Sequence, residues 1–232
     1  MVPAVKRYAE ELATKIQEEL AKYASFSQSL DRSFPKRLVS ETPPAEYTKA
    51  ELFNRLNELE KKRSHLVDAG LLDPEKDQEF QISDIKADQR AVLAFYVNDV
   101  ENKLSKLNAI ADRIELLKKV INTRFEHKQM KVDKEEGFTF ITDRDRPIEA
   151  TKLSSGEQHQ LVLLYELLFN VEKNRLVLID EPEISLHLAW QKQFLKDLEE
   201  MANLSQLDVL VATHSPQIIS DRWDLTVELK SL

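Results

Sequence analysis

Two short apolar runs, separated by a helical segment, constrain the fold of this chain more than any other feature. RLVLID occupies residues 175–180, DVLVAT occupies residues 208–213, and residues 186–201 between them have the composition of a helix. Runs that are apolar at nearly every position are typical of parallel strands covered on both faces. The strand–helix–strand order therefore predicts an α/β fold in which both runs belong to one parallel sheet covered by helices.

The first half of the chain, by contrast, is helical. Three apolar stripes follow spacings of three and four residues, and prolines 43 and 44 separate the first from the second, which ends near Gly70. The third is the longest and follows a heptad with one slip near Leu117. An ordinary helical hairpin or bundle fits these stripes, and so does a coiled-coil arm on a globular head. The stripe residues are Val5, Leu12, Ile16, Leu20 and Tyr23, then Leu52, Leu56, Leu59 and Leu66, then Leu93, Val97, Val100, Leu104, Leu107, Ala111, Ile114 and Ile121.

The pattern changes after residue 126. KQMKV and FTFIT are expected to be short strands joined by a turn at Gly137, an apolar helix is expected over residues 158–170, and LTVEL at 225–229 is a last strand candidate. We therefore expect two regions. Residues 1–126 would form a helical insertion or arm, and residues 127–232 would form an α/β lobe.

Polar groups stand where the two apolar runs end. Asp180 and Glu181 follow the first run, and ligands of parallel sheets bind at the carboxyl ends of strands. Two adjacent carboxylates leaving a sheet core are costly unless something uses them. In a nucleotide hydrolase the Asp helps to hold Mg²⁺ and the Glu polarises the attacking water. The same pair could instead cap the next turn.

His214 follows the second run, in VLVATHSPQ. A single histidine is usually structural, but next to a parallel strand that ends in Asp-Glu it becomes a candidate to contact a γ-phosphate or to orient water. Ser215 and Pro216 then begin a short helix, because Pro is tolerated at the first helical position.

The segment TKLSSGEQHQ at residues 151–160 precedes the apolar helix and holds one of only three glycines in the chain. Such a segment can be a plain loop, or a cradle of backbone amides that binds an anion at the helix N-terminus. Gly156 would let the backbone approach closely. Glu157 lies near the same N-terminus and could equally be a capping group.

The order of these motifs resembles the C-terminal lobe of ABC-type ATPases. Residues 153–158 are similar to the signature motif, residues 176–181 to the Walker B strand, and Thr213-His214 to the switch-histidine loop. The segments HQLVLLYELL and DEPEISLHL, the latter with His187, are similar to the soluble SMC/RecF-like branch, especially bacterial AAA family ATPases of the anti-phage and overcoming-lysogenization-defect type. The resemblance covers about residues 128–230, and the helical half is similar only in kind to the insertion of that branch.

The resemblance implies ATP and Mg²⁺ as cofactors and a role for each motif residue. Asp180 would bind the metal, Glu181 would be the catalytic base, and His214 would sense the γ-phosphate. The signature segment would bind the γ-phosphate of ATP held by a second subunit. Its residues are Ser154, Ser155, Gly156, Glu157 and Gln158.

A P-loop is missing from the sequence. No GxxxxGK[ST] occurs, and glycines stand only at positions 70, 137 and 156. The P-loop supplies the main amide cradle and the lysine for the phosphates, and in the family it lies in an N-terminal lobe. We therefore expect this chain to need a Walker A lobe or a second ATPase subunit, to form a homodimer when complete, and not to bind ATP tightly alone.

The composition limits where the protein is expected to occur and which partners it is expected to bind. The chain has no cysteine and a formal net charge of -8, and no apolar run approaches the roughly 20 residues of a membrane helix. We expect a soluble, cytoplasmic protein without membrane contacts. DNA as a partner follows only from the resemblance, because the basic candidates are few and mixed with acidic residues, which is typical of solvated loops. They are Lys128, Lys131, Arg144 and Arg146.

Two other functions stay open. In one, the protein is a non-catalytic interaction module whose helices bind an effector such as a nuclease or toxin subunit. In the other, it is the nucleotide-binding subunit of a membrane transporter, which the long helical insertion disfavours.

Overall fold

The computed structural model of this protein describes residues 3–43, 45–74, 85–86 and 89–227. The chain divides into two compact units. The helical unit consists of Glu10–Ile114 and Val132–Phe138, and the α/β unit consists of Met1–Ala9, Glu115–Lys131 and Thr139–Leu232. The units thus cut through the long helices and the first hairpin instead of following one point in the sequence.

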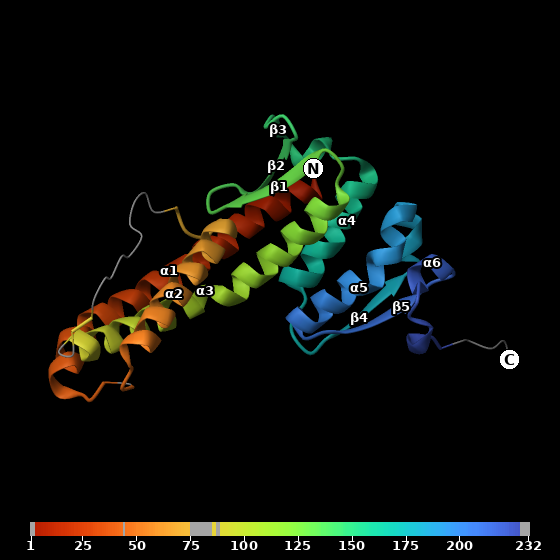
Figure 1. The fold of residues 1–232 in the computed structure, drawn as a ribbon. Helices are drawn as coiled ribbons and strands as arrows, with labels where there is room; N and C mark the ends of the chain where they lie inside the picture. The colour runs from red at the N-terminus through yellow and green to blue at the C-terminus, as the bar shows by residue number, and fades with distance from the viewer. Residues whose placement is uncertain (1–2, 44, 75–84, 87–88, 228–232) are drawn as a thin grey trace. The chain divides into compact units, whose positions relative to one another are not determined.

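Three long helices supply the helical unit: α1 (Ala4–Ser40), α2 (Lys49–Asp68) and α3 (Arg90–Arg124). They run side by side in Figure 1 and bury the apolar stripes against one another. The predicted stripes are confirmed at most positions, and Leu117, where the heptad slips, is buried as well. Stripe residues with at most 2% exposure are Val5, Leu12, Ile16, Leu52, Leu59, Leu66, Val97, Leu104, Leu107, Ala111, Ile114 and Ile121.

Gly70 ends α2 as the sequence predicts. Its φ of +77° is in the left-handed region that favours glycine. An added Cβ would lie 2.0 Å from the carbonyl oxygen of Val132, which excludes any larger residue without a backbone shift.

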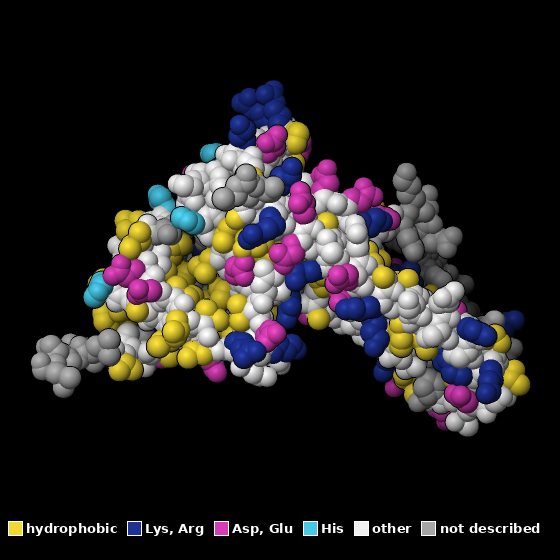
Figure 2. All heavy atoms as spheres, turned by 180° about the vertical axis from the view of Figure 1, so that it is seen from behind, with side chains coloured by type: hydrophobic (Ala, Val, Ile, Leu, Met, Phe, Trp, Pro, Cys, Tyr) yellow, Lys and Arg dark blue, Asp and Glu magenta, His cyan; other side chains and the backbone are white. Residues whose placement is uncertain are grey.

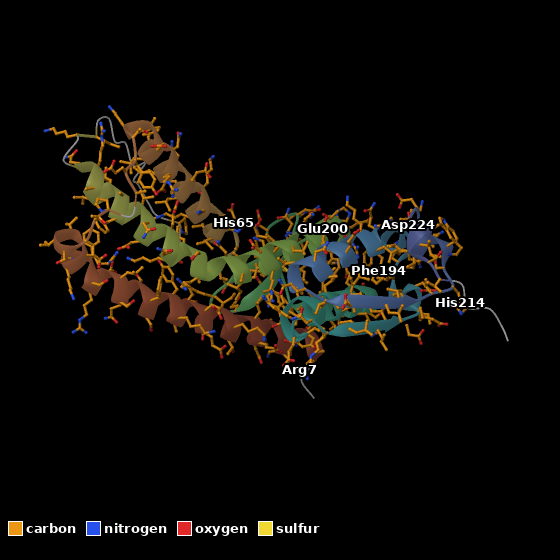
Figure 3. The ribbon with its side chains drawn as sticks, turned by 90° about the horizontal axis from the view of Figure 1, so that it is seen from below. Arg7, His65, Phe194, Glu200, His214 and Asp224 are labelled. Atoms are coloured by element: carbon orange, nitrogen blue, oxygen red, sulfur yellow. The ribbon has the colours of Figure 1, made fainter. Side chains whose placement is uncertain are left out.

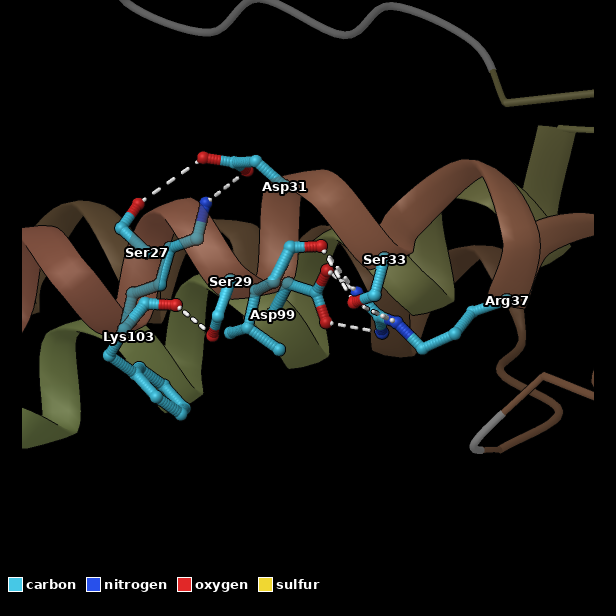
Figure 4. A network of polar contacts seen from close by, with 9 residues as sticks. Ser27, Ser29, Asp31, Ser33, Arg37, Asp99 and Lys103 are labelled. Atoms are coloured by element: carbon cyan, nitrogen blue, oxygen red, sulfur yellow. Dashed lines mark hydrogen bonds and ion pairs between the residues drawn. The ribbon is translucent and has the colours of Figure 1, made fainter.

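An ion pair between a half-buried arginine and a buried aspartate joins α1 to α3 (Figure 4). Arg37 Nη1 and Nη2 donate to the two carboxylate oxygens of Asp99, at 2.8 and 2.6 Å. Arg37 also donates to the hydroxyl of Ser33 and to the carbonyl of Leu30. Asp99 is only 4% exposed, so its charge depends on this bidentate partner.

A small antiparallel sheet follows α3. Its strands β1 (Lys128–Asp133), β2 (Gly137–Thr142) and β3 (Pro147–Ile148) lie in the order β1-β2-β3. The two strands predicted from KQMKV and FTFIT are therefore confirmed. Gly137 starts β2 with a φ of +75°, as expected of a glycine that ends a turn.

The rest of the α/β unit alternates helices and strands. α4 (Ser155–Tyr165) continues into a π-helical turn, η3 (Glu166–Asn170), and is followed by β4 (Leu176–Asp180), η4 (Pro182–Ser185), α5 (Leu188–Ser205) and β5 (Asp208–Ala212). α6 (Pro216–Ile219) and the short turn η5 (Trp223–Leu225) come last. β4 and β5 pair in parallel, with Leu178 opposite Leu210 and Asp180 opposite Ala212, so the predicted parallel pairing is confirmed.

Aromatic stacking marks the core of this unit. Tyr165 is fully buried and stacks on Tyr8 and on Phe169, with ring centroids 4.6 and 4.9 Å apart. Phe125 stacks on Phe140 and Trp190. These contacts tie the start of α1 and the end of α3 to α4 and α5.

The expectation that helices cover both faces of the parallel sheet is wrong for the described residues. Leu176, Leu178 and Leu210 share one face of the β4–β5 pair and are 62%, 69% and 60% exposed. Figure 2 shows hydrophobic side chains gathered on the left of the view, where β4 and β5 lie. The opposite face, with Val177 and Ile179, is half-buried or buried.

The last strand candidate is also wrong where it can be judged. Trp223–Leu225 forms a single 3₁₀ turn and residues 226–227 are not in a strand, while residues 228–229 lie outside the described residues. Among the helices described, none is both long and apolar enough to cross a membrane.

Candidate functional site

The carboxyl ends of β4 and β5 bring together the two polar groups that the sequence places after its apolar runs. The backbone N–H of Glu181 donates to the carbonyl of Ala212 at 2.8 Å, which extends the parallel pairing by one bond. Just beyond it, His214 Nε2 lies 3.9 Å from Glu181 Oε1. Acid pair and imidazole therefore share one edge of the sheet, as predicted.

This edge is open to solvent. The His214 side chain is 93% exposed, the Glu181 side chain is 45% exposed, and Asp180 is exposed too. Figure 3 shows His214 beyond the end of the paired strands. A ligand can therefore approach all three groups from outside.

Glu181 has a left-handed backbone, with φ of 44° and ψ of 55°. This conformation is uncommon for a residue other than glycine and persists only where the surroundings fix it. Here the Glu181 N–H is bonded to Ala212, its carbonyl accepts from the N–H of Ile184, and Pro182 follows at the first position of η4. The sharp turn directs the chain away from the sheet directly after the acid pair.

A third acid, Glu183, connects the two strand ends and is not among the residues predicted from the sequence. Its carboxylate oxygens each lie 2.8 Å from the donating hydroxyl of Thr213, and Oε1 accepts the N–H of His214 at 2.9 Å. Burial would raise the pKa of Glu183, but hydrogen bonds from its own backbone N–H, from the Thr213 hydroxyl and from the N–H groups after it outweigh burial and lower the pKa below its ordinary value. The only signal in the sequence is the repeated acid in DEPE.

Gln191 of α5 makes a second connection between the same loops. Its amide nitrogen lies 3.4 Å from the carbonyl of Glu183 and 3.3 Å from that of Leu186, and its Oε1 accepts from the hydroxyl of Ser215 at 2.9 Å. Gln191 is 8% exposed, so a buried side chain holds the loop after β4 to the loop after β5.

The Ser154 turn begins α4 with a capping box. Ser154 Oγ accepts from the Glu157 N–H, and Glu157 Oε2 accepts from the Ser154 N–H. Lys128 of β1 lies 2.7 Å from the other Glu157 oxygen. Burial would raise the pKa of Glu157, but Lys128 and Ser154 together lower it. Of the two roles left open for Glu157, the structure therefore shows the capping one.

The other signature residues frame an accessible helix N-terminus. Ser154 and Ser155 are exposed and Gly156 is half-buried. The Gln158 amide donates to the carbonyls of Leu153 and Thr151, at 2.7 and 3.2 Å, and so braces the turn. Free amides at such an N-terminus favour an anion.

A divalent cation at this edge would need further ligands besides the side chains of Asp180 and Glu181. Within the described residues, no group of three or more His, Asp or Glu side chains could hold a metal ion. Nucleotide sites commonly bind Mg²⁺ through only one or two carboxylates together with phosphate oxygens and water. Asp180 is an exposed carboxylate of that kind.

Two comparisons with known proteins show what the chain as a whole is similar to. The sequence model of a family described as "AAA domain, putative AbiEii toxin, Type IV TA system" matches residues 5–220. A segment of 108 residues is 30% identical to Protein ea59 of Escherichia phage lambda. That segment makes up 47% of this chain and 20% of the phage protein, so the match spans about a fifth of that relative.

Proposed function

Since the chain belongs to this AAA-domain family, whose members are ATPases of the P-loop type, we propose that it is the signature and Walker B lobe of an ABC-type ATPase of the SMC/RecF-like branch. The observation that carries the proposal is the pairing of Asp180-Glu181 with His214 at one sheet edge. In this proposal ATP hydrolysis switches a dimer and moves its helical arms, in anti-phage defence or a DNA-related process.

The proposal gives the edge residues distinct roles. Asp180 would hold Mg²⁺, which would neutralise charge on the phosphates. Glu181 accepts a hydrogen bond from the attacking water and draws its proton, and His214 contacts the γ-phosphate through its imidazole. The exposure of all three groups is consistent with a ligand that arrives from another surface.

The Ser154 turn would act on a nucleotide held by a second subunit. Its exposed hydroxyl and the amides of Ser155 and Gly156 suit the γ-phosphate, because a helix N-terminus carries partial positive charge. Glu157 supports this role indirectly, since the capping box keeps the turn in one shape.

The exposed sheet face supports the need for a further lobe. Three leucines, Leu176, Leu178 and Leu210, lie together on it, and among the described residues β4 and β5 pair only with each other. Contiguous exposed apolar side chains indicate a surface that another element covers. We propose that the lobe with the P-loop packs on this face.

A cavity in the helical unit favours a second candidate function, a module that binds an effector protein. The described residues of α1, α2 and α3 line a cavity of about 1060 Å³. Tyr23, Arg63, Tyr96 and Lys103 are among its lining residues, so it offers both aromatic and charged contacts. Replacing Asp180, Glu181 and His214 together would leave effector binding unchanged if this module were the whole function.

A nucleotide titration by calorimetry tests the proposal. The 232-residue chain alone should show no binding of Mg·ATP at micromolar concentrations, whereas a protein that contains both lobes should bind it. In the latter, Asp180→Asn should weaken binding, and Glu172→Gln should not, because Glu172 forms an exposed ion pair with Arg175 on the surface. Micromolar affinity of the chain alone for Mg·ATP would refute the proposal that the nucleotide site is divided between two lobes.

A further inference from the structure

We infer that Glu183 is a positioning residue, which holds the loop of His214 to the loop of the acid pair and so determines where the imidazole stands. The effect of Glu183 on ATP hydrolysis rests on the proposed function. The contact itself follows from the geometry alone.

The His214 side chain cannot position itself. It is 93% exposed, and its contact with Glu181 is a 3.9 Å approach, too long for a hydrogen bond. Side chains without packing partners keep their rotamer freedom, so the position of the imidazole depends on the backbone beneath it.

That backbone is fixed by Glu183. β5 ends at Ala212, and the next two residues both donate to this carboxylate, Thr213 through its hydroxyl and His214 through its N–H. Thr213 Oγ1 in turn accepts the N–H of Ser215 at 3.0 Å. One carboxylate thus organises the whole turn between β5 and α6.

The same carboxylate connects the turn to the acid pair. Glu183 lies two residues after Glu181, within η4, and the strained backbone of Glu181 is fixed by the bond to Ala212. A displacement of the acid pair would therefore be transmitted to His214 through a short, hydrogen-bonded segment. Glu183 makes the two strand ends move as one.

Amide NMR of the uniformly ¹⁵N-labelled 232-residue chain tests the contact without any nucleotide. An N–H that donates to a carboxylate resonates downfield, so Glu183→Gln should move the His214 amide proton upfield. Thr213→Val is the second variant and removes the hydroxyl that connects Glu183 to the Ser215 N–H. It should move the Ser215 amide proton upfield as well. Glu172→Gln is the matched control and should leave both signals in place.

The outcomes separate this inference from the proposed function. The positioning role is overturned if the His214 amide proton keeps its chemical shift in folded Glu183→Gln. Should that variant not fold, an unchanged shift of the Ser215 amide proton in Thr213→Val overturns it. In a protein with both lobes, Glu183→Gln should lower kcat with KM little changed, and unchanged kcat also overturns it. A wild-type protein without any ATP hydrolysis overturns the proposed function instead, and the amide signature would remain.

Discussion

His214 Nε2 lies 3.9 Å from Glu181 Oε1, although the two residues follow different strands. The parallel register of β4 and β5 accounts for this, because Asp180 pairs with Ala212 and both chains leave the sheet at the same edge. The acid pair and the imidazole therefore lie at the carboxyl ends of parallel strands, where ligands of such sheets bind.

The capping box of α4 should depend on pH. The pKa of Glu157 lies below its ordinary 4.5, so its contribution to the free energy of unfolding is complete above that pH and is lost as the pH falls through the lowered pKa. Glu157→Gln should cost about 1 kcal/mol at neutral pH, because glutamine can still accept the Ser154 N–H but loses the ion pair with Lys128. Urea unfolding at several pH values should show the difference from wild type shrinking in acid. A difference independent of pH would contradict the charged role of Glu157.

The ion pair between Arg37 and Asp99 should matter far more than its neighbour between Lys103 and Asp31. The Asp99 side chain is 6% exposed, and its removal leaves the half-buried guanidinium of Arg37 without its carboxylate partner, which should cost about 1–3 kcal/mol. The Asp31 side chain is 65% exposed, so Asp31→Ala should cost about 1 kcal/mol or less. Chemical unfolding of Asp99→Ala and Asp31→Ala measures both, and equal effects would contradict the assignment.

The two faces of the β4–β5 pair should respond differently to polar substitution. Leu178→Ser should change the free energy of unfolding of the 232-residue chain by about 0.5 kcal/mol or less, because the side chain is 69% exposed. Ile179→Ser, on the buried face, should cost about 2–4 kcal/mol.

The same Leu178→Ser chain should fail to bind a separately expressed P-loop lobe in sedimentation experiments. Wild-type chain mixed with that lobe is the control. If Leu178→Ser binds the lobe as well as wild type does, the exposed leucine face is not the surface that the second lobe covers.

Sequence alone could predict the elements whose signals are local. Apolar runs define β4 and β5, the polar residues after them define the edge, and parallel pairing brings Asp180 and His214 together without knowledge of any other contact. The helix end at Gly70 is equally local, because it depends on one positive φ.

The exposed sheet face and the roles of Glu183 and Glu157 depend on tertiary contacts that the sequence does not show. Leu178 is apolar whether its cover lies in the same chain or elsewhere, so the sequence could not show that its face is exposed. The role of Glu183 could not be predicted, because its hydrogen bonds reach residues 30 and 31 positions away in the sequence. The sequence around Glu157 fits both a helix-capping residue and a member of the signature segment, and the contacts with Lys128 and Ser154 show the capping role.

Turnover of the Glu181→Gln variant, in a protein that contains both lobes, tests the central claim most directly. Glutamine keeps the size of the side chain and removes the base, so ATP hydrolysis should fall by about 10²- to 10⁴-fold while a nucleotide-bound dimer accumulates. Glu172→Gln, which also removes one exposed carboxylate, should hydrolyse ATP at the wild-type rate. Unchanged turnover in Glu181→Gln would contradict the account.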